Sequence, residues 1–256
     1  MNITSDTIYT HLLFSSPVKY ADNLTLYPLR MKDIVSFNLF KQAITVRKNS
    51  TFPVKKIIKM NYLEFLFFCH GNQELADEYE MPALPFYYTF AFQLLKMVFI
   101  DQDVKANVEE GGFKINDVDI TSDMFDDFRR IILLQNGVDF DIDEFIHYDT
   151  ERELEKAQAH INRNDHSTLE DYVDSIWIAM GITEDVVQNF TIRKFWRFIK
   201  RISKRDIFQI MKTAESSGFV KLKEPVSYWM NQVDGDDKYK DVKTNSANIR
   251  KMVSGE

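Results

Sequence analysis

Glycine and proline are scarce in this chain, with only eight glycines and six prolines in 256 residues. β-Sandwiches and barrels need many turn residues, so this scarcity favours helices. Phenylalanine is abundant, with 21 residues, and apolar residues make up 45% of the chain. Disordered chains lack the aromatic surface that offsets the loss of backbone entropy on ordering. The sequence therefore predicts a folded, mainly α protein, long enough for two helical subdomains.

Apolar periodicity predicts four helices in the first half of the chain. They cover residues 32–48, 61–78, 86–100 and 121–136. The second and third are rich in Phe on nearly every side, which is typical of helices in a domain centre or under a partner. Thr121 and Gly137 suit the N-cap and the left-handed stop of the fourth helix.

Strand signals are few. Residues 1–22 are polar and lack a sustained period, so we expect an irregular lead-in. Residues 24–27 alternate in polarity before a proline, which predicts at most a short edge strand. Residues 104–108 and 113–116 alternate around a Glu-Glu-Gly-Gly turn, which predicts a small β-hairpin.

The second half is predicted to contain a further set of helices. A polar helix is expected over residues 150–164, and a loop over 162–167. Thr168 and Asp171 fit a capping pattern for a helix that ends at Gly181. The remaining helical stretches are expected to follow Thr183, Thr191 and Ser203, the last of them ending at Ser217 and Gly218.

Gly137 and the acidic stretch Asp139–Asp149 suggest a boundary between two helical regions. We therefore divide the chain into a Phe-rich region (1–137), a helical region with a basic amphipathic helix (138–233) and a flexible tail (234–256). The tail is charged and has no large apolar cluster.

The residue patterns predict no catalytic centre, metal site or cofactor. Asp139, Asp141 and Asp143 resemble half of a calcium-binding loop, but Glu144 and Thr150 occupy the positions that require Gly and Glu. The five histidines lack metal-ligand spacing, and no phosphate-binding glycine motif or nucleophile elbow occurs. The single cysteine, Cys69, lies in a Phe-rich run and is predicted to be buried and inert.

Charge is distributed unevenly. The chain carries a net charge of −7, yet Arg193–Lys223 holds ten Lys or Arg residues against two acids, a net charge of +8. Within this stretch Phe195, Phe198, Ile199 and Ile202 share a helical face with cations between them. A basic amphipathic helix is therefore predicted.

Three interpretations of this basic helix remain open. It is a core-packed helix with a solvated basic face, a docking site for an acidic protein partner, or a nucleic-acid-binding element. The overall acidity of the chain argues against nucleic acid, and the globular neighbouring helices argue against a membrane surface. The candidate binding residues are Arg193, Lys194, Arg197, Lys200, Arg201, Lys204 and Arg205.

Several strings together resemble tail-associated proteins of bacteriophages that infect Gram-positive bacteria, described as tail assembly chaperones or baseplate-region proteins. The strings are Leu26–Asp33, Thr168–Asp174, Gly181–Thr183, Phe190–Phe195, Thr213–Gly218 and Tyr228–Met230. The resemblance is clearest over residues 168–230. None of the strings is a catalytic signature, so the resemblance implies a non-enzymatic role in building the tail.

The resemblance further implies that the partners are other tail proteins, such as the tape measure or a baseplate subunit. We expect no cofactor and no membrane partner. The N-terminus lacks the charge and apolar pattern of a signal peptide, and no apolar run reaches the length of a membrane span. The expected location is therefore the cytoplasm of the infected host cell or the virion tail.

Overall fold

A computed structural model describes residues 4–144, 149–150, 167–218 and 226–231. Up to residue 98 the elements are α1 (Tyr9–Phe14), β1 (Val18–Ala21), β2 (Leu24–Leu26), the 3₁₀ helix η1 (Met31–Asp33), α2 (Ile34–Phe40), the 3₁₀ helix η2 (Lys41–Ile44), α3 (Lys48–Thr51), α4 (Lys55–Lys59), α5 (Tyr62–Cys69), α6 (Gln73–Glu78), the 3₁₀ helix η3 (Leu84–Phe86) and α7 (Tyr87–Val98). They are followed by β3 (Val104–Asn107), β4 (Gly112–Ile115), β5 (Val118–Asp119), α8 (Ser122–Asn136), α10 (Leu169–Met180), α11 (Glu184–Gln188) and α12 (Ile192–Ser216). The prediction of a mainly α protein with small β elements is confirmed.

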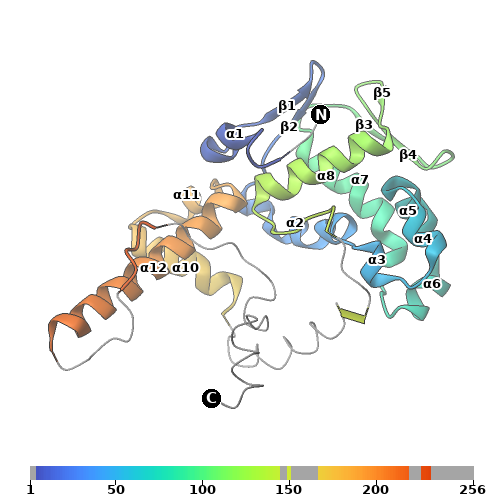
Figure 1. The fold of residues 1–256 in the computed structure, drawn as a ribbon. Coiled ribbons are helices and arrows are strands. Elements are labelled where there is room, and N and C mark those ends of the chain that lie inside the picture. The colour runs from blue at the N-terminus through green and yellow to red at the C-terminus, as the bar shows by residue number, and fades with distance from the viewer. Residues whose placement is uncertain (1–3, 145–148, 151–166, 219–225, 232–256) are drawn as a thin grey trace, which may run out of the picture.

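Two small antiparallel sheets lie on one side of the helices (Figure 1). The predicted hairpin is confirmed as β3 and β4, and β5 adds a third strand. β2 pairs with β1, so the prediction of an irregular lead-in over residues 1–22 is wrong. The prediction failed because β1 and α1 are short and each buries one side chain, Val18 and Leu12, so neither gives a periodic apolar pattern.

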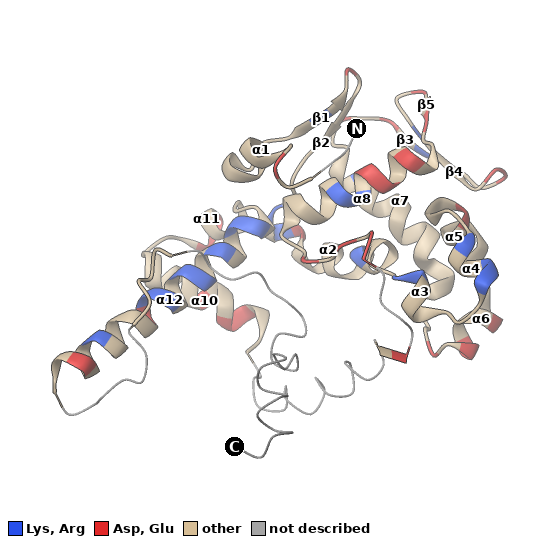
Figure 2. Cartoon of the chain, in the orientation of Figure 1, with Lys and Arg blue, Asp and Glu red and all other residues tan. Residues whose placement is uncertain are grey.

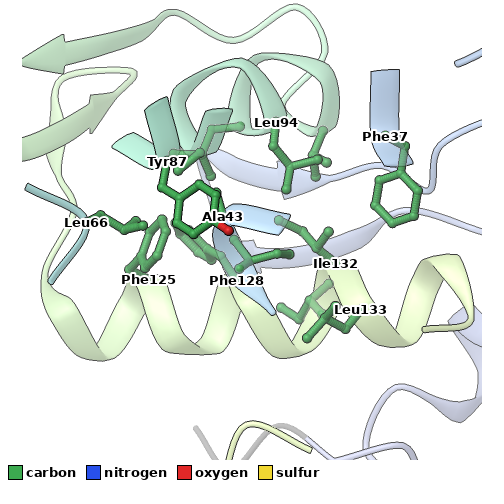
Figure 3. Close-up of a cluster of buried hydrophobic side chains, with 14 of the residues drawn as sticks. Phe37, Ala43, Leu66, Tyr87, Leu94, Phe125, Phe128, Ile132 and Leu133 are labelled. Atoms are coloured by element: carbon green, nitrogen blue, oxygen red, sulfur yellow. The ribbon is translucent and has the colours of Figure 1, made fainter. Parts of the chain in front are cut away.

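The core forms where side chains of α8, α5 and α7 gather in one cluster (Figure 3). Nine of the fifteen residues of α8 are buried, among them Phe125 and Phe128. Leu66 of α5 lies beside Phe125, and Tyr87 of α7 lies over the side chains of α8. The predicted helices over residues 86–100 and 121–136 are confirmed, with Thr121 accepting a hydrogen bond from the Met124 amide and Gly137 in the left-handed conformation.

The predicted helix over residues 32–48 is confirmed up to Ile44 as the continuous run of η1, α2 and η2, but it ends four residues earlier than predicted. Its end is fixed by side chains from elsewhere: the guanidinium of Arg129 donates to the Ile44 carbonyl over 3.0 and 3.2 Å, and the Tyr62 hydroxyl donates to the Ala43 carbonyl over 2.9 Å. The carbonyls that would continue the helix therefore already accept hydrogen bonds from other helices.

The predicted helix over residues 61–78 is wrong in its continuity, because it is two helices, α5 and α6. Gly71 lies between them at a φ of +69°, and its amide donates to the Pro85 carbonyl. Asn72 then caps α6 by accepting from the Leu75 amide. Cys69, at the end of α5, is buried as predicted, and this burial raises the pKa of its thiol to about 12.

We call residues 4–144 the body, and α10, α11, α12 and residues 226–231 the C-terminal arm. The arm is joined to the body by a short antiparallel contact. The Met31 amide donates to the Phe190 carbonyl over 2.9 Å, and the Ile192 amide donates to the Leu29 carbonyl over 3.0 Å. From this junction α12 extends away from α8 (Figure 1).

Local signals in the arm were mostly predictive. Thr168 forms a capping box with Asp171, and Gly181 ends α10 in the left-handed conformation. The helix start predicted at Ser203 is wrong, since α12 runs uninterrupted from Ile192 to Ser216. Serine is compatible with a helix interior when no backbone break competes, so its capping preference alone misled the prediction.

Three sequence predictions fall outside the described residues: most of the helix over residues 150–164, the loop over 162–167 except Ser167, and the tail over 234–256. The domain boundaries at 137 and 233 stay predictions.

Candidate functional site

The seven predicted binding residues all lie on α12, the most highly charged helix of the arm (Figure 2). The helix has 25 residues, of which eight are Lys or Arg and two are acids. Thr191 caps it by accepting a hydrogen bond from the Lys194 amide, and only Ile192 and Phe195 are buried. The prediction of a basic amphipathic helix is therefore confirmed, but its seven cations have different surroundings.

Arg193 belongs to the joint between arm and body. Its guanidinium donates to the Leu12 carbonyl at the end of α1 over 2.8 Å. Its side chain also packs against Gly137, where an added Cβ would lie 3.2 Å from the Arg193 Cγ. Burial, followed by the positive charge of Arg197, lowers the pKa of Arg193. Arg193 therefore acts mainly in positioning α12 on the body.

Arg201 and Lys204 hold the segment of residues 226–231 against α12. The Arg201 guanidinium donates to the carbonyls of Trp229 and Asn231 over 2.9 and 2.7 Å, and the Lys204 ammonium donates to the Asn231 carbonyl over 3.3 Å. The rings of Phe208 and Tyr228 also meet edge to face at 5.5 Å. These two cations thus already serve a contact within the chain.

The other four predicted binding residues are Lys194, Arg197, Lys200 and Arg205. Arg205 pairs with its sequence neighbour Asp206, and Arg197 is exposed. Lys194 and Lys200 are half-buried along the helix. Together these side chains give the first four turns of α12 a positive side that lies next to the junction with the body.

An apolar stripe on the outer half of α12 was missed by the sequence analysis. Ile207 and Ile210 are 58% and 68% exposed, and Met211 is 38% exposed, so all three are unusually open for large apolar side chains. Their spacings of three and four residues place them on one side of the helix. That spacing is visible in the sequence, but the helix start expected at Ser203 separated these residues from the basic segment.

At its inner end the same helix is covered. Trp196 meets Tyr172 of α10 edge to face at 5.2 Å, and Phe198 meets Phe190 at 5.2 Å. Phe195 is fully buried. The predicted apolar face of Phe195, Phe198, Ile199 and Ile202 therefore does pack on the core, so this part of α12 behaves as an ordinary packed helix.

The acidic stretch after α8 binds arginines of the body. Asp143 accepts hydrogen bonds from the Arg130 guanidinium at 2.8 and 3.0 Å, and Glu144 pairs with Arg47. Arg47 also stacks on the Phe140 ring, 4.5 Å from its centroid. Among the described residues, no group of three or more His, Cys, Asp or Glu side chains is placed to hold a metal ion.

A shallow hollow of about 280 Å³ lies between α5 and the β3–β4 turn. Phe67 closes one side by packing on Gly111, where an added Cβ would lie 2.6 Å from the ring. Gly111 also has a φ of +71°. Both this backbone conformation and the lack of space for a Cβ therefore require glycine there. The hollow is below the size range of typical ligand pockets of about 300–1,000 Å³. It therefore offers a weaker candidate site than the arm.

Comparison with known families finds a match that covers the arm. Residues 161–234 match the family described as the YomV second domain. YomV is a protein of a Bacillus phage region, so the match is consistent with a phage origin in Gram-positive bacteria. The YomV-like segment contains α10, α11, α12 and residues 226–231, which is the whole arm. No curated protein and no solved structure matches the chain significantly.

The structure also brings together two of the strings that carry the resemblance to tail-associated proteins. Leu26–Asp33 lies in the body and Phe190–Phe195 lies in the YomV-like segment, and their backbones form the junction of body and arm. Tyr228–Met230 lies against the outer half of α12. None of the helices in the described ranges is both long and apolar enough to span a bilayer.

Proposed function

We propose that this chain is a non-enzymatic bacteriophage protein that acts in tail assembly by binding other tail proteins through the basic side of α12. The observation that supports it best is the coincidence of the YomV-like segment with the arm, whose long helix is cationic and has only two buried residues. The tape measure and a baseplate subunit are the proposed partners. An assembly chaperone and a structural component of the tail would use the same surface.

The electrostatics of the chain favour such a role. A basic surface on an overall acidic protein steers an acidic partner to one place and repels approach elsewhere. The body fixes the base of α12 through Arg193 and the Leu29–Ile192 hydrogen bond, so the surface is presented in a defined direction. Preformed surfaces lose less entropy when they bind.

Nucleic acid is the alternative ligand for the same cations. It is less well supported, because the chain carries a net charge of −7 and would repel the dense negative charge of nucleic acid everywhere except at this helix. Phosphate binding would also lose affinity steeply as salt increases. Binding of short duplexes and single strands, measured between about 50 and 200 mM salt, separates the two functions.

The experiment is a pairwise binding assay between the purified chain and recombinant tape-measure and baseplate proteins of the same phage. The test variant is Lys194→Glu/Arg197→Glu. An acid at position 194 lies in the first turn of α12, where the helix dipole favours it, so folding should be retained. We expect the association rate constant to fall by at least about tenfold. Among mutants of one interface this constant varies over about 1–3 decades.

The matched control is Lys55→Glu/Lys59→Glu, which makes the same change of charge on exposed lysines of α4. It should leave the association rate within about twofold, because only general attraction changes. Equal slowing by both variants would mean that net charge, not the basic side of α12, governs binding. Absence of binding to every tail protein would refute the proposed function.

A further inference from the structure

Exposed apolar side chains lie beside two arginines where α1 meets α12. The guanidinium of Arg193 donates to the Leu12 carbonyl over 2.8 Å, so it lies against the end of α1. Leu13, the next residue, is 44% exposed, and Arg197, one turn after Arg193, is exposed as well. Tyr9 is 59% exposed and lies on the same side of α1 as Leu13, four residues away. We call Tyr9, Leu13 and Arg197 the joint face.

The two arginines at this joint are not neutralised by a carboxylate of the described residues, because neither Arg193 nor Arg197 forms an ion pair there. After burial, the positive charge of Arg197 has the largest effect on the pKa of Arg193, and the phenol of Tyr9 acts in the opposite direction. The three side chains are therefore close together. A carboxylate that approaches the joint face would offset the repulsion between the two guanidinium groups.

The outer side of α10 carries the opposite charge beside exposed apolar side chains. Glu170, Asp174 and Ile178 follow one another at intervals of four residues, so they lie along one line of the helix. Ile178 is 82% exposed and Trp177 is 47% exposed. α10 contains no Lys or Arg, and within the described ranges neither Glu170 nor Asp174 has an ion pair or a side-chain hydrogen bond. We call these four residues the acidic face.

The two faces lie on different sides of the molecule. α10 packs on α12 through its other side, where Ile176 is buried and Tyr172 meets Trp196 edge to face. α1 lies across the beginning of α12 from α10 (Figure 1). The acidic face of one chain is therefore directed away from its own joint face, and both faces are open to another molecule.

We infer that the joint face of one copy of this chain binds the acidic face of a second copy. Charge complementarity selects this occupant, because the carboxylates of the acidic face match Arg197 and its two apolar side chains match Tyr9 and Leu13. Exposed ion pairs add little affinity, so we expect apolar burial to supply most of the attraction and the charges to fix the orientation. A contact between two different faces is head to tail, so it joins copies into a ring or an open row.

Other occupants account for less of the structure. An acidic segment of another protein, or a nucleic acid, would cover the joint face and leave the acidic face of α10 open. A basic segment of another protein would do the reverse. A second copy covers both faces with one contact. The net charge of −7 on each copy does not prevent it, because repulsion between distant charges is screened within about 8 Å at physiological salt.

The inference goes beyond the proposed function, which concerns binding to tail proteins. Both use Arg197, so a copy presents this residue to a tail protein only where its joint face is free. The acidic face lies on α10, outside the basic side of α12, so a variant of α10 separates the two activities.

The test is self-association of the full chain, measured by sedimentation velocity between about 5 and 200 μM, a range suited to a small, transient interface. We expect the average mass to rise above that of one chain as the concentration increases. Leu13→Ser/Arg197→Glu alters the joint face, and Asp174→Lys/Ile178→Ser alters the acidic face. Each should weaken self-association by at least about tenfold, because it removes an apolar contact and places like charges together.

Mixing the two variants tests the head-to-tail orientation. In an equimolar mixture, the intact acidic face of one variant meets the intact joint face of the other, so association should return in the form of dimers. The control Val54→Ser/Lys55→Glu makes the same kinds of change on exposed residues at the start of α4 and should associate like the unaltered chain. Circular dichroism establishes that all variants are folded.

Three results would overturn the inference: an unaltered chain that stays monomeric throughout this range, a mixture that stays monomeric, or a control that associates as weakly as the two variants. If the chain stays monomeric and Leu13→Ser/Arg197→Glu weakens binding of a tail protein, that protein is the occupant of the joint face instead. Asp174→Lys/Ile178→Ser should lose self-association and still bind the tail protein. If self-association follows these expectations and no tail protein binds, only the proposed function fails.

Discussion

α8 and α12 obey the same local rules but meet different surroundings. Each begins after a threonine whose side chain caps the first turn, and each is amphipathic. In α8, nine of fifteen residues are buried, whereas in α12 only two of twenty-five are. Local sequence therefore determines that both helices form, while the availability of packing partners determines that α8 stabilises the body and α12 presents a surface.

The largest expected difference between body and arm is in thiol reactivity. Cys69 is buried and the pKa of its thiol is raised to about 12, so at pH 8 it is almost entirely protonated as well as inaccessible. We expect it to react at least about a thousandfold more slowly in the native protein than in denaturant, since reaction requires opening of the body.

A cysteine placed on the arm provides the comparison. Ser216 is exposed at the end of α12, so the thiol of a Ser216→Cys variant should react at nearly the rate of an unfolded thiol. Mass spectrometry of labelled peptides distinguishes the two sites in one sample. Reaction of native Cys69 within tenfold of the introduced cysteine would mean that the body opens as readily as the arm.

Body and arm should also differ in how much one apolar side chain contributes to the free energy of unfolding. Phe128 is fully buried in α8 and contacts Tyr20 and Phe99, so Phe128→Ala should lower the free energy of unfolding by about 3–5 kcal/mol. Ile210→Ala, on the exposed apolar stripe of α12, should change it by no more than about 0.5 kcal/mol. Urea unfolding followed by circular dichroism measures both. A large loss for Ile210→Ala would mean that the stripe is covered in solution.

The contrast also explains what the sequence could predict. Helices α7 and α8 were predictable because their signals are local: an apolar run after Pro85 for α7, and apolar periodicity with caps at Thr121 and Gly137 for α8. The breaks at Ile44 and Gly71 were not, because the hydrogen bonds from Arg129 and to Pro85 come from distant parts of the chain. For the candidate site, the positions of the cations on one helix were predictable from spacing.

What each cation contacts was not predictable. Arg193 reaches the Leu12 carbonyl, 181 residues away in the chain, and Arg201 reaches the Trp229 and Asn231 carbonyls. Periodicity places side chains on a face but carries no information about which backbone carbonyl lies opposite that face. The exposure of Ile207, Ile210 and Met211 has the same origin, since it depends on where α10 and the body stop covering α12.

The smallest expected effect comes from the C-terminal residues. Truncation after Val233 retains the Phe208–Tyr228 contact and the hydrogen bonds from Arg201, and it removes residues without a large apolar cluster. The melting temperature should therefore change by only about 1–2 °C. Truncation after Gly218 removes those contacts too and should lower the free energy of unfolding by about 1–2 kcal/mol. That cost reflects the loss of one aromatic pair and of hydrogen bonds from a cation that remains solvated.

Differential scanning calorimetry of the two truncated chains beside the full chain measures both changes. A fall of more than about 5 °C for the shorter truncation would correspond to roughly 1–2 kcal/mol and would show that residues 234–256 pack on the protein. Equal melting temperatures for both truncated chains would instead mean that the contacts of residues 226–231 with α12 contribute nothing to the stability of the arm.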